Sequence, residues 1–266
     1  MKQSIPLKSI LNARELGGYR SDDGRMVRKG VLLRTACLAG IADEDIRTLR
    51  EDFRLGDIVD FRMKMELAGA EDPPMEGVRY THLDVIDISG YPEMSQELQV
   101  NLSDIVSMLE LTEKMGRLNE KMYIGFLNEE MGRKAFSGFF RILLAAPPDR
   151  AVLWHCTSGK DRTGLAAMLL LSALGVDEPV MMEDYLLTNE YNARRIAGTR
   201  QAMKSRGYDD AFAEKATLLL DGVDESFMRN ALVFLKRQFG SVTGYLRDAL
   251  ELSEDDILAL KEKYLA

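Results

Sequence analysis

The chain is poor in the side chains that crosslink small secreted folds or hold structural metals. Its 266 residues include two cysteines, Cys37 and Cys156, and two histidines, His82 and His155. So few cysteines exclude a disulfide framework, and the same counts argue against a zinc site. We therefore expect no metal and no other cofactor. A free reactive thiol would survive best in a reducing compartment.

Long apolar runs and an excess of positive charge are also missing. No run of 18 apolar residues is present, and the opening MKQSIPLKSILNARELGG lacks the apolar core of a signal peptide. The formal net charge of −8 argues against a nucleic-acid-binding surface, so any site for a polyanion has to be a local basic pocket. We expect a cytoplasmic protein with no nucleic-acid partner and no membrane insertion, although export by a non-classical route would leave no trace here.

Strand and helix patterns are interspersed along the chain. The region 12–40 reads as strand, turn, strand, and short apolar runs predict further strands at 57–62, 78–87 and 151–154. Helical spacing of apolar residues predicts the following helices: 42–53, 134–146, 165–174, one starting near Glu178, and most of 211–266, interrupted at FGSVTGY. This order favours one α/β domain over residues 1–266, with helices packed on a central sheet.

Residues 91–132 differ from their surroundings. Their apolar side chains recur at helical intervals among polar ones, as in LSDIVSMLELTEKMGRLNEKMYIGFL. We expect one or two amphipathic helices inserted here. An ordinary packed helix pair and a mobile cover over the active site are both compatible with this pattern.

The stretch HCTSGKDRTG, residues 155–164, lies between the apolar runs AVLW and LAAMLLLSALG. A loop between a strand and the start of a helix is a natural anion site, because the first amides of a helix have no intrahelical acceptor. The helix dipole adds partial positive charge at that end. Glycine lets the backbone curl so that successive amides converge on one point. The small residues that permit this are Thr157, Ser158 and Gly159.

Charged side chains strengthen this anion site, and Cys156 lies at its base. Lys160 and Arg162 add full positive charges, and an arginine fork matches two oxygens of a phosphate. Helix N-termini and nearby cations lower a cysteine pKa from about 8.5 to roughly 3.5–7.5, which favours the nucleophilic thiolate. We interpret the loop as a phosphate cradle with a nucleophile at its base.

Two other interpretations of the loop fit less well. Adjacent strand residues point to opposite faces, so His155 is badly placed to take the proton of Cys156 as in a Cys–His protease. We expect His155 to be buried and to hold the loop by hydrogen bonds. The nucleotide-binding P-loop needs a glycine and a hydroxyl that SGKD lacks.

Five residues separate Cys156 from Arg162, and His155 precedes them. This H-C-x5-R pattern, followed by a hydroxyl residue, resembles the signature of the cysteine-dependent protein tyrosine phosphatases. HCTSGKDRTG is similar to the form found in bacterial tyrosine/serine phosphatases. Further stretches resemble other elements of that family: NARELGGYR, LLRTACLAGI, IVDFRMKMEL, EDYLLTNE and FGSVTGYLRDALELSEDDI. The likeness extends from about residue 10 to 262 and implies the phosphatase fold, with a mostly parallel central sheet flanked by helices.

The resemblance implies a two-step mechanism without metal. Cys156 would attack phosphorus to form a cysteinyl-phosphate, while Arg162 and the loop amides hold the phosphoryl oxygens. Thr163 would hydrogen-bond the sulfur and help it leave, and water would release phosphate. The implied substrates are phosphotyrosine proteins, with phosphoserine/threonine proteins and phosphoinositides as further classes. Lys160 is either a second cation lining the pocket mouth, suited to extra phosphates, or an ordinary solvated lysine.

The proton donor for the leaving group stays open. Tyrosine phosphatases often use a W-P-D loop, which this sequence lacks. Asp87, Asp161 and Asp84 are the candidates, and Asp87 resembles the family's donor best by position. We expect structural roles more than chemical ones for the family's framework residues, which are Arg14, Arg62 and Glu66.

Three rival functions fit parts of the pattern. They are a catalytically idle phosphate-binding module, a phosphoinositide-selective lipid phosphatase and a sulfurtransferase-type enzyme. Intact Cys156, Arg162 and Thr163 argue against the idle module, and the H-C-x5-R-T continuation argues against the sulfurtransferase. The sequence does not define the oligomeric state.

Overall fold

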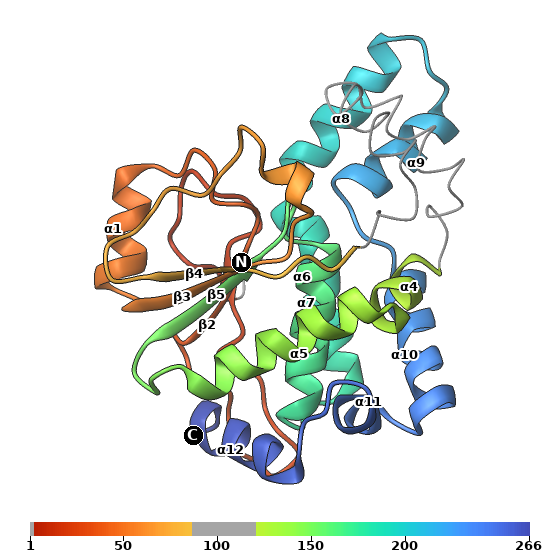
Figure 1. Ribbon diagram of the computed structural model, residues 1–266. Helices are drawn as coiled ribbons and strands as arrows, with labels where there is room; N and C mark the ends of the chain where they lie inside the picture. Colours follow the sequence, from red (N-terminus) through yellow and green to blue (C-terminus); the bar gives the residue numbers. More distant parts are fainter. Residues whose placement is uncertain (1–2, 87–120) are drawn as a thin grey trace.

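The computed structural model describes residues 3–86 and 121–266, and a five-stranded sheet forms its centre (Figure 1). The order across the sheet is β1-β2-β5-β3-β4. β1 pairs antiparallel with β2, and the other three pairings are parallel. The strands are β1 (Arg14–Glu15), β2 (Leu32–Thr35), β3 (Leu55–Asp60), β4 (Arg79–His82) and β5 (Ala151–His155). The predicted α/β fold with a mostly parallel sheet is confirmed.

The central strand β5 ends level with both of its neighbours. His155 is in register with Thr35 of β2 and with Asp60 of β3. The chain segments that follow these three strands therefore emerge at one edge of the sheet. In open α/β sheets ligands bind outside the carboxyl ends of the strands, so this edge is where a site is expected.

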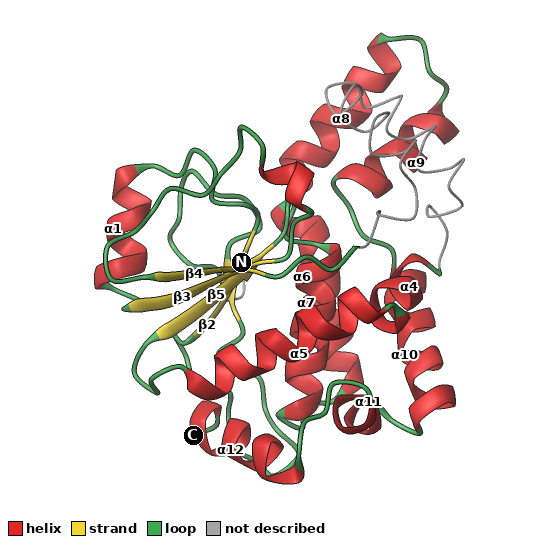
Figure 2. Cartoon of the chain, in the orientation of Figure 1, coloured by secondary structure: helices red, strands yellow, loops and turns green. Residues whose placement is uncertain are grey.

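Helices cover both faces of the sheet (Figure 2). α1 (Asp43–Glu51) lies on one face, and most of the other helices lie on the opposite face or beyond it. The remaining elements are η1 (Lys64–Leu67), α4 (Met122–Asn128), α5 (Glu130–Ala145), α6 (Asp161–Ala173), α7 (Glu178–Tyr191), α8 (Ala193–Ser205), α9 (Asp210–Leu220), α10 (Glu225–Phe239), α11 (Val242–Asp248) and α12 (Glu254–Tyr264). Among these described residues no helix is long and apolar enough to cross a bilayer.

Each face of the sheet has its own hydrophobic core. The alternation of strand side chains sends Val152 and Trp154 of β5 into the larger core and Ala151 and Leu153 into the smaller core beside α1. In the larger core the Trp154 ring lies 5.2 Å from that of Phe139. β5 is buried along its whole length, which explains why AVLWH has no polar face.

α6 runs through the larger core and carries the phosphate-loop candidate at its N-terminus. Eleven of its thirteen residues are buried, so the helix has no solvent-facing stripe. It packs against α7 and α11 among others. The apolar run after Gly164 is therefore a core helix that holds the loop in the middle of the molecule.

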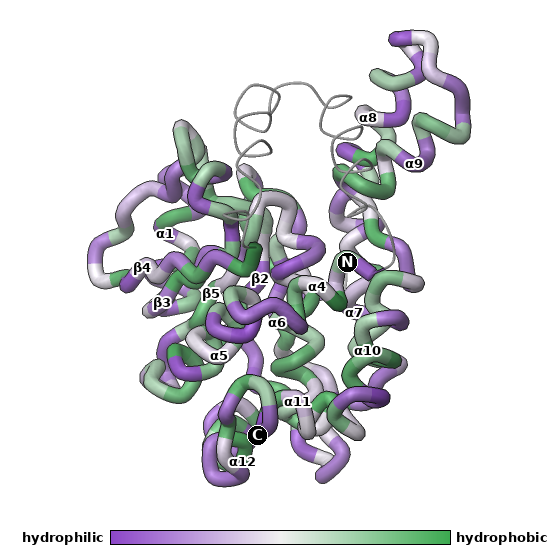
Figure 3. Tube along the Cα trace, turned by 45° about the vertical axis from the view of Figure 1, so that its right-hand side comes forward, coloured by the Kyte–Doolittle hydropathy of each residue, from purple (hydrophilic) through white to green (hydrophobic). Residues whose placement is uncertain are grey.

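The pair α8 and α9 extends away from the sheet, with hydrophilic and hydrophobic segments in alternation (Figure 3). The two helices pack on each other around a small cluster of Met203, Ala213 and Ala216. This cluster is separate from both cores of the sheet.

The expected elements match with adjusted bounds. The helix predicted at Glu178 begins there, whereas the strand predicted at 78–87 is confined to Arg79–His82. The C-terminal part breaks at Gly240 as expected, and it also breaks at 221–224 and 249–253, where the sequence pattern predicted no interruption. Of the predicted insertion, 91–120 lies outside the described residues, and 121–132 contains α4 and the start of α5.

Candidate active site

The loop 156–160 joins β5 to α6 and depends on Gly159. The φ angle of Gly159 is +65°, and a Cβ at this position would lie 2.3 Å from the carbonyl oxygen of Thr35. A side chain is therefore excluded both by the left-handed conformation and by the close approach of β2. The segment that follows β2 also bonds the loop, because the amide of Cys37 donates to the carbonyl of Thr157 at 3.2 Å.

Side chains behind the loop bind its carbonyl oxygens. The Asn12 Nδ2 donates to the carbonyls of Gly159 at 2.8 Å and Ser158 at 3.3 Å. Arg34 Nη2 donates to the same Gly159 carbonyl at 3.0 Å. In a trans peptide the carbonyl and the following N–H point in opposite directions. Fixing these carbonyls therefore turns the next amides away from Asn12, as a phosphate cradle requires.

One buried carboxylate pairs with both arginines that support the loop. Asp184 on α7 pairs with Arg14 Nε at 3.1 Å and with Arg34 Nη1 at 2.7 Å, and all three side chains are buried. Burial alone would raise the pKa of Asp184, but the two arginines outweigh it and hold the pKa below its usual value. Burial, together with Arg14, lowers the pKa of Arg34 to about 10. The predicted supporting residue Arg14 thus acts with two residues that were not predicted.

His155 lies under the loop in a second buried charge cluster. Its Nδ1 is 3.3 Å from the carbonyl of Cys156, and its Nε2 is 2.7 Å from Asp72 Oδ2 without the alignment of a hydrogen bond. Arg62 Nη2 donates to Asp60 at 2.6 Å and to Asp72 at 2.9 Å. The carboxylates of Asp60 and Asp72 lie close enough to His155 to suggest a metal site. The Arg62 guanidinium already supplies the positive charge there.

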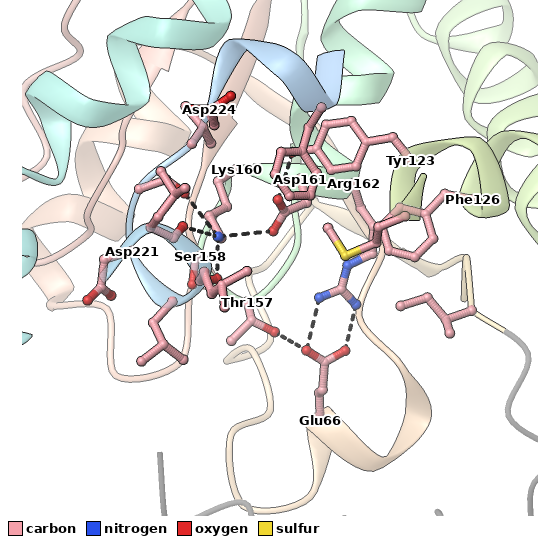
Figure 4. A pocket seen from close by; sticks show the side chains of 18 of the residues that line it. Glu66, Tyr123, Phe126, Thr157, Ser158, Lys160, Asp161, Arg162, Asp221 and Asp224 are labelled. Atoms are coloured by element: carbon pink, nitrogen blue, oxygen red, sulfur yellow. Dashed lines mark hydrogen bonds and ion pairs between the residues drawn. The ribbon is translucent and has the colours of Figure 1, made fainter. Parts of the chain in front are cut away.

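Glu66 holds the predicted phosphate-binding arginine. Arg162 Nη1 and Nη2 donate to the two carboxylate oxygens of Glu66 at 2.6 and 3.0 Å, and Thr157 Oγ1 donates to Glu66 as well (Figure 4). Burial would lower the pKa of Arg162, but the negative charges of Glu66 and Cys156 raise it above its usual value. Arg162 is therefore a permanent cation with its planar fork fixed at the loop.

Cys156 and Thr163 are both buried in the described fold. Among the described residues the Thr163 Oγ1 has no hydrogen-bond partner, so the implied bond to the Cys156 sulfur is not formed in this structure. The Thr163 carbonyl instead accepts from Trp154 Nε1 at 3.2 Å. This bond ties the first turn of α6 to the central strand.

Lys160 is neither a solvated lysine nor a free cation at the pocket mouth. It is 6% exposed, and its Nζ donates to the carbonyls of Leu219 at 2.5 Å and Gly222 at 3.0 Å. These carbonyls belong to the C-terminal end of α9 and the turn after it, where carbonyls have no intrahelical donor. The expectation of a solvated lysine was therefore wrong. Lys160 does line the cavity beside the loop, but its Nζ is already bonded to the α9 end, which could not be placed there from sequence.

The three candidate proton donors have different surroundings. Asp161 lines the cavity and accepts a hydrogen bond from Tyr123 Oη at 2.7 Å. Asp84 accepts from the backbone amides of Lys64 and Ile86, and burial raises its pKa. Asp87 lies outside the described residues.

A cavity of about 550 Å³ opens beside the loop. Thr157, Ser158, Lys160, Asp161 and Arg162 line one part of it, together with Glu66. Much of the remaining wall is apolar or aromatic, formed by Met65, Ile86, Met122, Tyr123, Phe126, Tyr185, Leu218, Leu219, Val223 and Phe227. A space with a charged end and apolar walls suits an aryl phosphate.

Several residues of the site were missed at the level of sequence. Asn12, Arg34 and Asp184 lie inside the quoted family-like stretches, but nothing in those stretches shows which polar side chains become buried partners. Tyr185 lies in the same quoted stretch as Asp184, whereas Tyr123 lies in none of them. Their proximity to Asp161 depends on how α4 and α7 pack around α6.

Comparisons with known proteins show which family the chain resembles. A model described as a tyrosine phosphatase family matches residues 5–266. The chain is 32% identical over 274 residues to a Cupriavidus necator protein named as a putative tyrosine-protein phosphatase, H16_A0669, covering 100% of this chain and 89% of that one. It is 28% identical over 251 residues to the triple specificity protein phosphatase PtpB of Mycobacterium tuberculosis, covering 86% and 89%.

A solved structure of a cysteine-to-serine variant of P. aeruginosa TpbA in complex with pTyr also matches. The TM-score is 0.34 at 17% identity, and the match covers 73% of this chain and 89% of that one. The family model, by contrast, extends over nearly the whole chain and includes the loop, its buried supports and the cavity wall. The chain therefore belongs to the tyrosine phosphatase family.

Proposed function

We propose that this protein hydrolyses phosphotyrosine through a cysteinyl-phosphate intermediate on Cys156. The observation that carries the proposal is the loop itself: Cys156 follows β5 directly, and Arg162 lines an adjoining cavity with aromatic walls. The buried supports of Gly159 favour an anion site that exists before substrate arrives.

The first step joins sulfur to phosphorus. The Cys156 thiolate attacks, the S–P bond forms, and the P–O bond to the aryl oxygen breaks. Arg162 and the loop amides stabilise the charge on the phosphoryl oxygens. The departing oxygen takes a proton from a carboxylic acid, for which Asp161, Asp87 and Asp84 are the candidates. Water then attacks phosphorus and gives a proton back to that carboxylate, the S–P bond breaks, and inorganic phosphate leaves.

Replacement of the nucleophile tests this mechanism. Cys156→Ser should reduce turnover of an aryl phosphate, measured without added metal, to background while phosphotyrosine still binds in calorimetry. Appreciable turnover by Cys156→Ser would remove Cys156 from its role. A wild-type protein that binds phosphate but never turns over would establish the idle binding module instead.

The candidate acids are separated by leaving-group dependence. Replacing the true donor by asparagine should lower kcat/KM by about 10²-fold or more when the leaving group is a phenol of high pKa. The same replacement should have much less effect when the leaving group is an activated phenol that departs without a proton. Asp87→Asn, Asp161→Asn and Asp84→Asn are compared on both substrates, and the variant with unequal losses identifies the donor.

We further propose that phosphotyrosine is preferred over phosphoinositides, with phosphoserine/threonine as a secondary class. The apolar cavity wall favours an aromatic ring, and Lys160, the candidate for a second phosphate, is already bonded to carbonyls of the α9 end. The name of PtpB supports a broader range than one substrate. A panel of phosphopeptides and soluble phosphoinositides compared by kcat/KM tests this preference.

A further inference from the structure

Three hydroxyl and carboxyl groups in the cavity wall form a chain of hydrogen bonds. The first is Asp161, with its side chain 21% exposed. Tyr123 Oη lies 2.7 Å from Asp161 Oδ1 and 2.9 Å from Tyr185 Oη. Tyr185 Oη in turn donates to the backbone carbonyl of Asp224 at 3.3 Å. Both tyrosines are almost completely buried.

The two phenols are neutral hydrogen-bonding groups at ordinary pH. Burial raises the pKa of both, and the negative charge of Asp161 raises it further. The Tyr123 ring is held between Phe126 and Phe227 at centroid distances of 6.2 and 5.6 Å. The hydroxyl is therefore fixed in place and cannot leave Asp161 for solvent.

This chain can be satisfied in two directions. When Asp161 is ionised, Tyr123 donates to it, and Tyr185 donates to Tyr123 or to the Asp224 carbonyl. When Asp161 carries a proton, Asp161 donates to Tyr123, Tyr123 donates to Tyr185, and Tyr185 donates to that carbonyl. A phenol hydroxyl can both donate and accept, so no heavy atom moves between the two states. Replacing Asp161 by asparagine, or either tyrosine by phenylalanine, would remove the hydrogen bonds of one direction or of both.

Resting on the function proposed above, we propose that Tyr123 is a positioning residue for Asp161, and that Tyr185 lets the Tyr123 hydroxyl switch between donor and acceptor. Asp161 then gives its proton to the ester oxygen as the P–O bond breaks and the S–P bond forms. In the second step Asp161 takes a proton from water as the water oxygen bonds phosphorus and the S–P bond breaks. The thiolate and the protonated Asp161 are regenerated, so protons and bonds balance over the cycle.

Other charges face the same carboxylate and set its surroundings. Lys160 Nζ is 3.6 Å from Asp161 Oδ2, and the charge of Arg162 also acts on Asp161. Arg34 and Asp224 act on Tyr185 at the far end of the chain. The hydroxyl chain itself fits either form of Asp161.

Tyr123→Phe removes the hydroxyl and keeps the ring. We expect kcat/KM for phenyl phosphate to fall about tenfold, the size of one hydrogen bond to a charged group. This ratio reports the steps up to P–O cleavage and leaves out the hydrolysis of the cysteinyl-phosphate, which both substrates share. For an activated aryl phosphate kcat/KM should change less than about twofold, because that leaving group needs no proton. The alkylation rate of Cys156 should stay unchanged. Tyr185→Phe should give the same pattern at about threefold.

Tyr245→Phe is the matched control for a lost buried hydroxyl. Tyr245 Oη donates to the Leu127 carbonyl at 2.8 Å, next to the same helix α4, and Tyr245 does not line the cavity. This variant loses a similar hydrogen bond and should leave the leaving-group pattern unchanged. Tyr123→Phe should also have no further effect in an Asp161→Asn background, since the hydroxyl acts through that carboxylate.

Three results overturn the proposal. They are equal losses of kcat/KM on both substrates in Tyr123→Phe, a full additional loss in the Asp161→Asn background, and equal losses of kcat/KM on both substrates in Asp161→Asn. The Cys156→Ser variant is measured in parallel. It distinguishes a failure of the positioning role of Tyr123 from a failure of the proposed phosphatase mechanism. If Cys156→Ser is inactive and one of the three results occurs, the positioning role fails and the proposed mechanism on Cys156 stands.

Discussion

Two groups of ion pairs in this protein have similar geometry and opposite surroundings. Beneath the phosphate loop, Asp184 pairs with Arg14 and Arg34 at 3.1 and 2.7 Å, and the side chains are 0–2% exposed. Between α8 and α9, Arg200 pairs with Glu214 at 2.5 Å, with side chains 44% and 66% exposed. The exposed pair is the shorter one. The N–O distance therefore does not show which of these ion pairs matters for the stability of the fold. Burial of the charged side chains does.

The two groups of ion pairs differ in what can replace a charged side chain that has been removed. On the exposed α8–α9 pair, water and salt replace either side chain at little cost. Beneath the loop no water is available to an isolated guanidinium, so loss of one carboxylate leaves two buried charges unpaired. Asp184 thus controls a part of the loop that it does not touch, through the Arg34 bond to the Gly159 carbonyl.

The largest expected effect comes from breaking the buried group. Asp184→Asn keeps the shape of the side chain and should lower the free energy of unfolding by about 3–5 kcal/mol, measured by urea denaturation at pH 7. Asp57→Asn is the control, because its partner Arg79 is 58% exposed and can turn to water. Similar losses in the two variants would show that burial does not separate the two kinds of pair.

The ion pairs of Asp184 also predict that stability depends on pH. The folded pKa of Asp184 lies below its usual value, so its contribution to stability is present above the unfolded pKa of about 3.9 and is lost as the pH falls through the folded pKa. The difference in unfolding free energy between wild type and Asp184→Asn should be constant from pH 7 to about 5 and shrink below about 4. A difference that grows on acidification would contradict the assigned direction of the shift.

A smaller loss is expected when the loop backbone is displaced. Gly159→Ala forces a Cβ against the carbonyl of Thr35, and kcat for an aryl phosphate should fall about 10²-fold, as small misplacements of reacting groups do. Gly40→Ala is the control, since Gly40 also has a positive φ, but a Cβ added there would have no atom within 4 Å among the described residues. Equal kinetic losses would assign the effect to backbone conformation in general and not to the contact with β2.

The smallest effect is expected on the exposed side of the comparison. Glu214→Gln removes the charge partner of Arg200, and the unfolding free energy should change by less than about 0.5 kcal/mol. Urea denaturation at low and high salt measures it. A loss above about 1 kcal/mol would show that the α8–α9 pair depends on its charges far more than exposed pairs usually do.

The sequence was sufficient for the parts of the site that are local. A strand, a loop of small residues and a helix start follow one another directly, so Gly159 and the order β5–loop–α6 were predictable from composition. The sheet class followed from the order of strands and helices. Both rest on neighbours in the chain, where pattern and geometry are tightly linked.

The contacts that were missed join distant parts of the chain. Lys160 meets the end of α9, and Asp161 meets Tyr123 of α4, across separations that no local pattern reports. Thr163 shows the opposite error: the expected bond is local, but its hydroxyl finds no partner among the described residues. Which polar groups meet in the interior is decided by helix packing, and spacing along the sequence does not encode it.

The supports of the loop come from both sides of Cys156 in the chain. Asn12, Arg14 and Arg34 precede it, whereas Asp184 follows it on α7. During synthesis on the ribosome the nucleophile therefore emerges before the carboxylate that its supports share. The support of the loop is complete only once α7 has packed against it, so a chain truncated before α7 would carry the nucleophile without its full cradle.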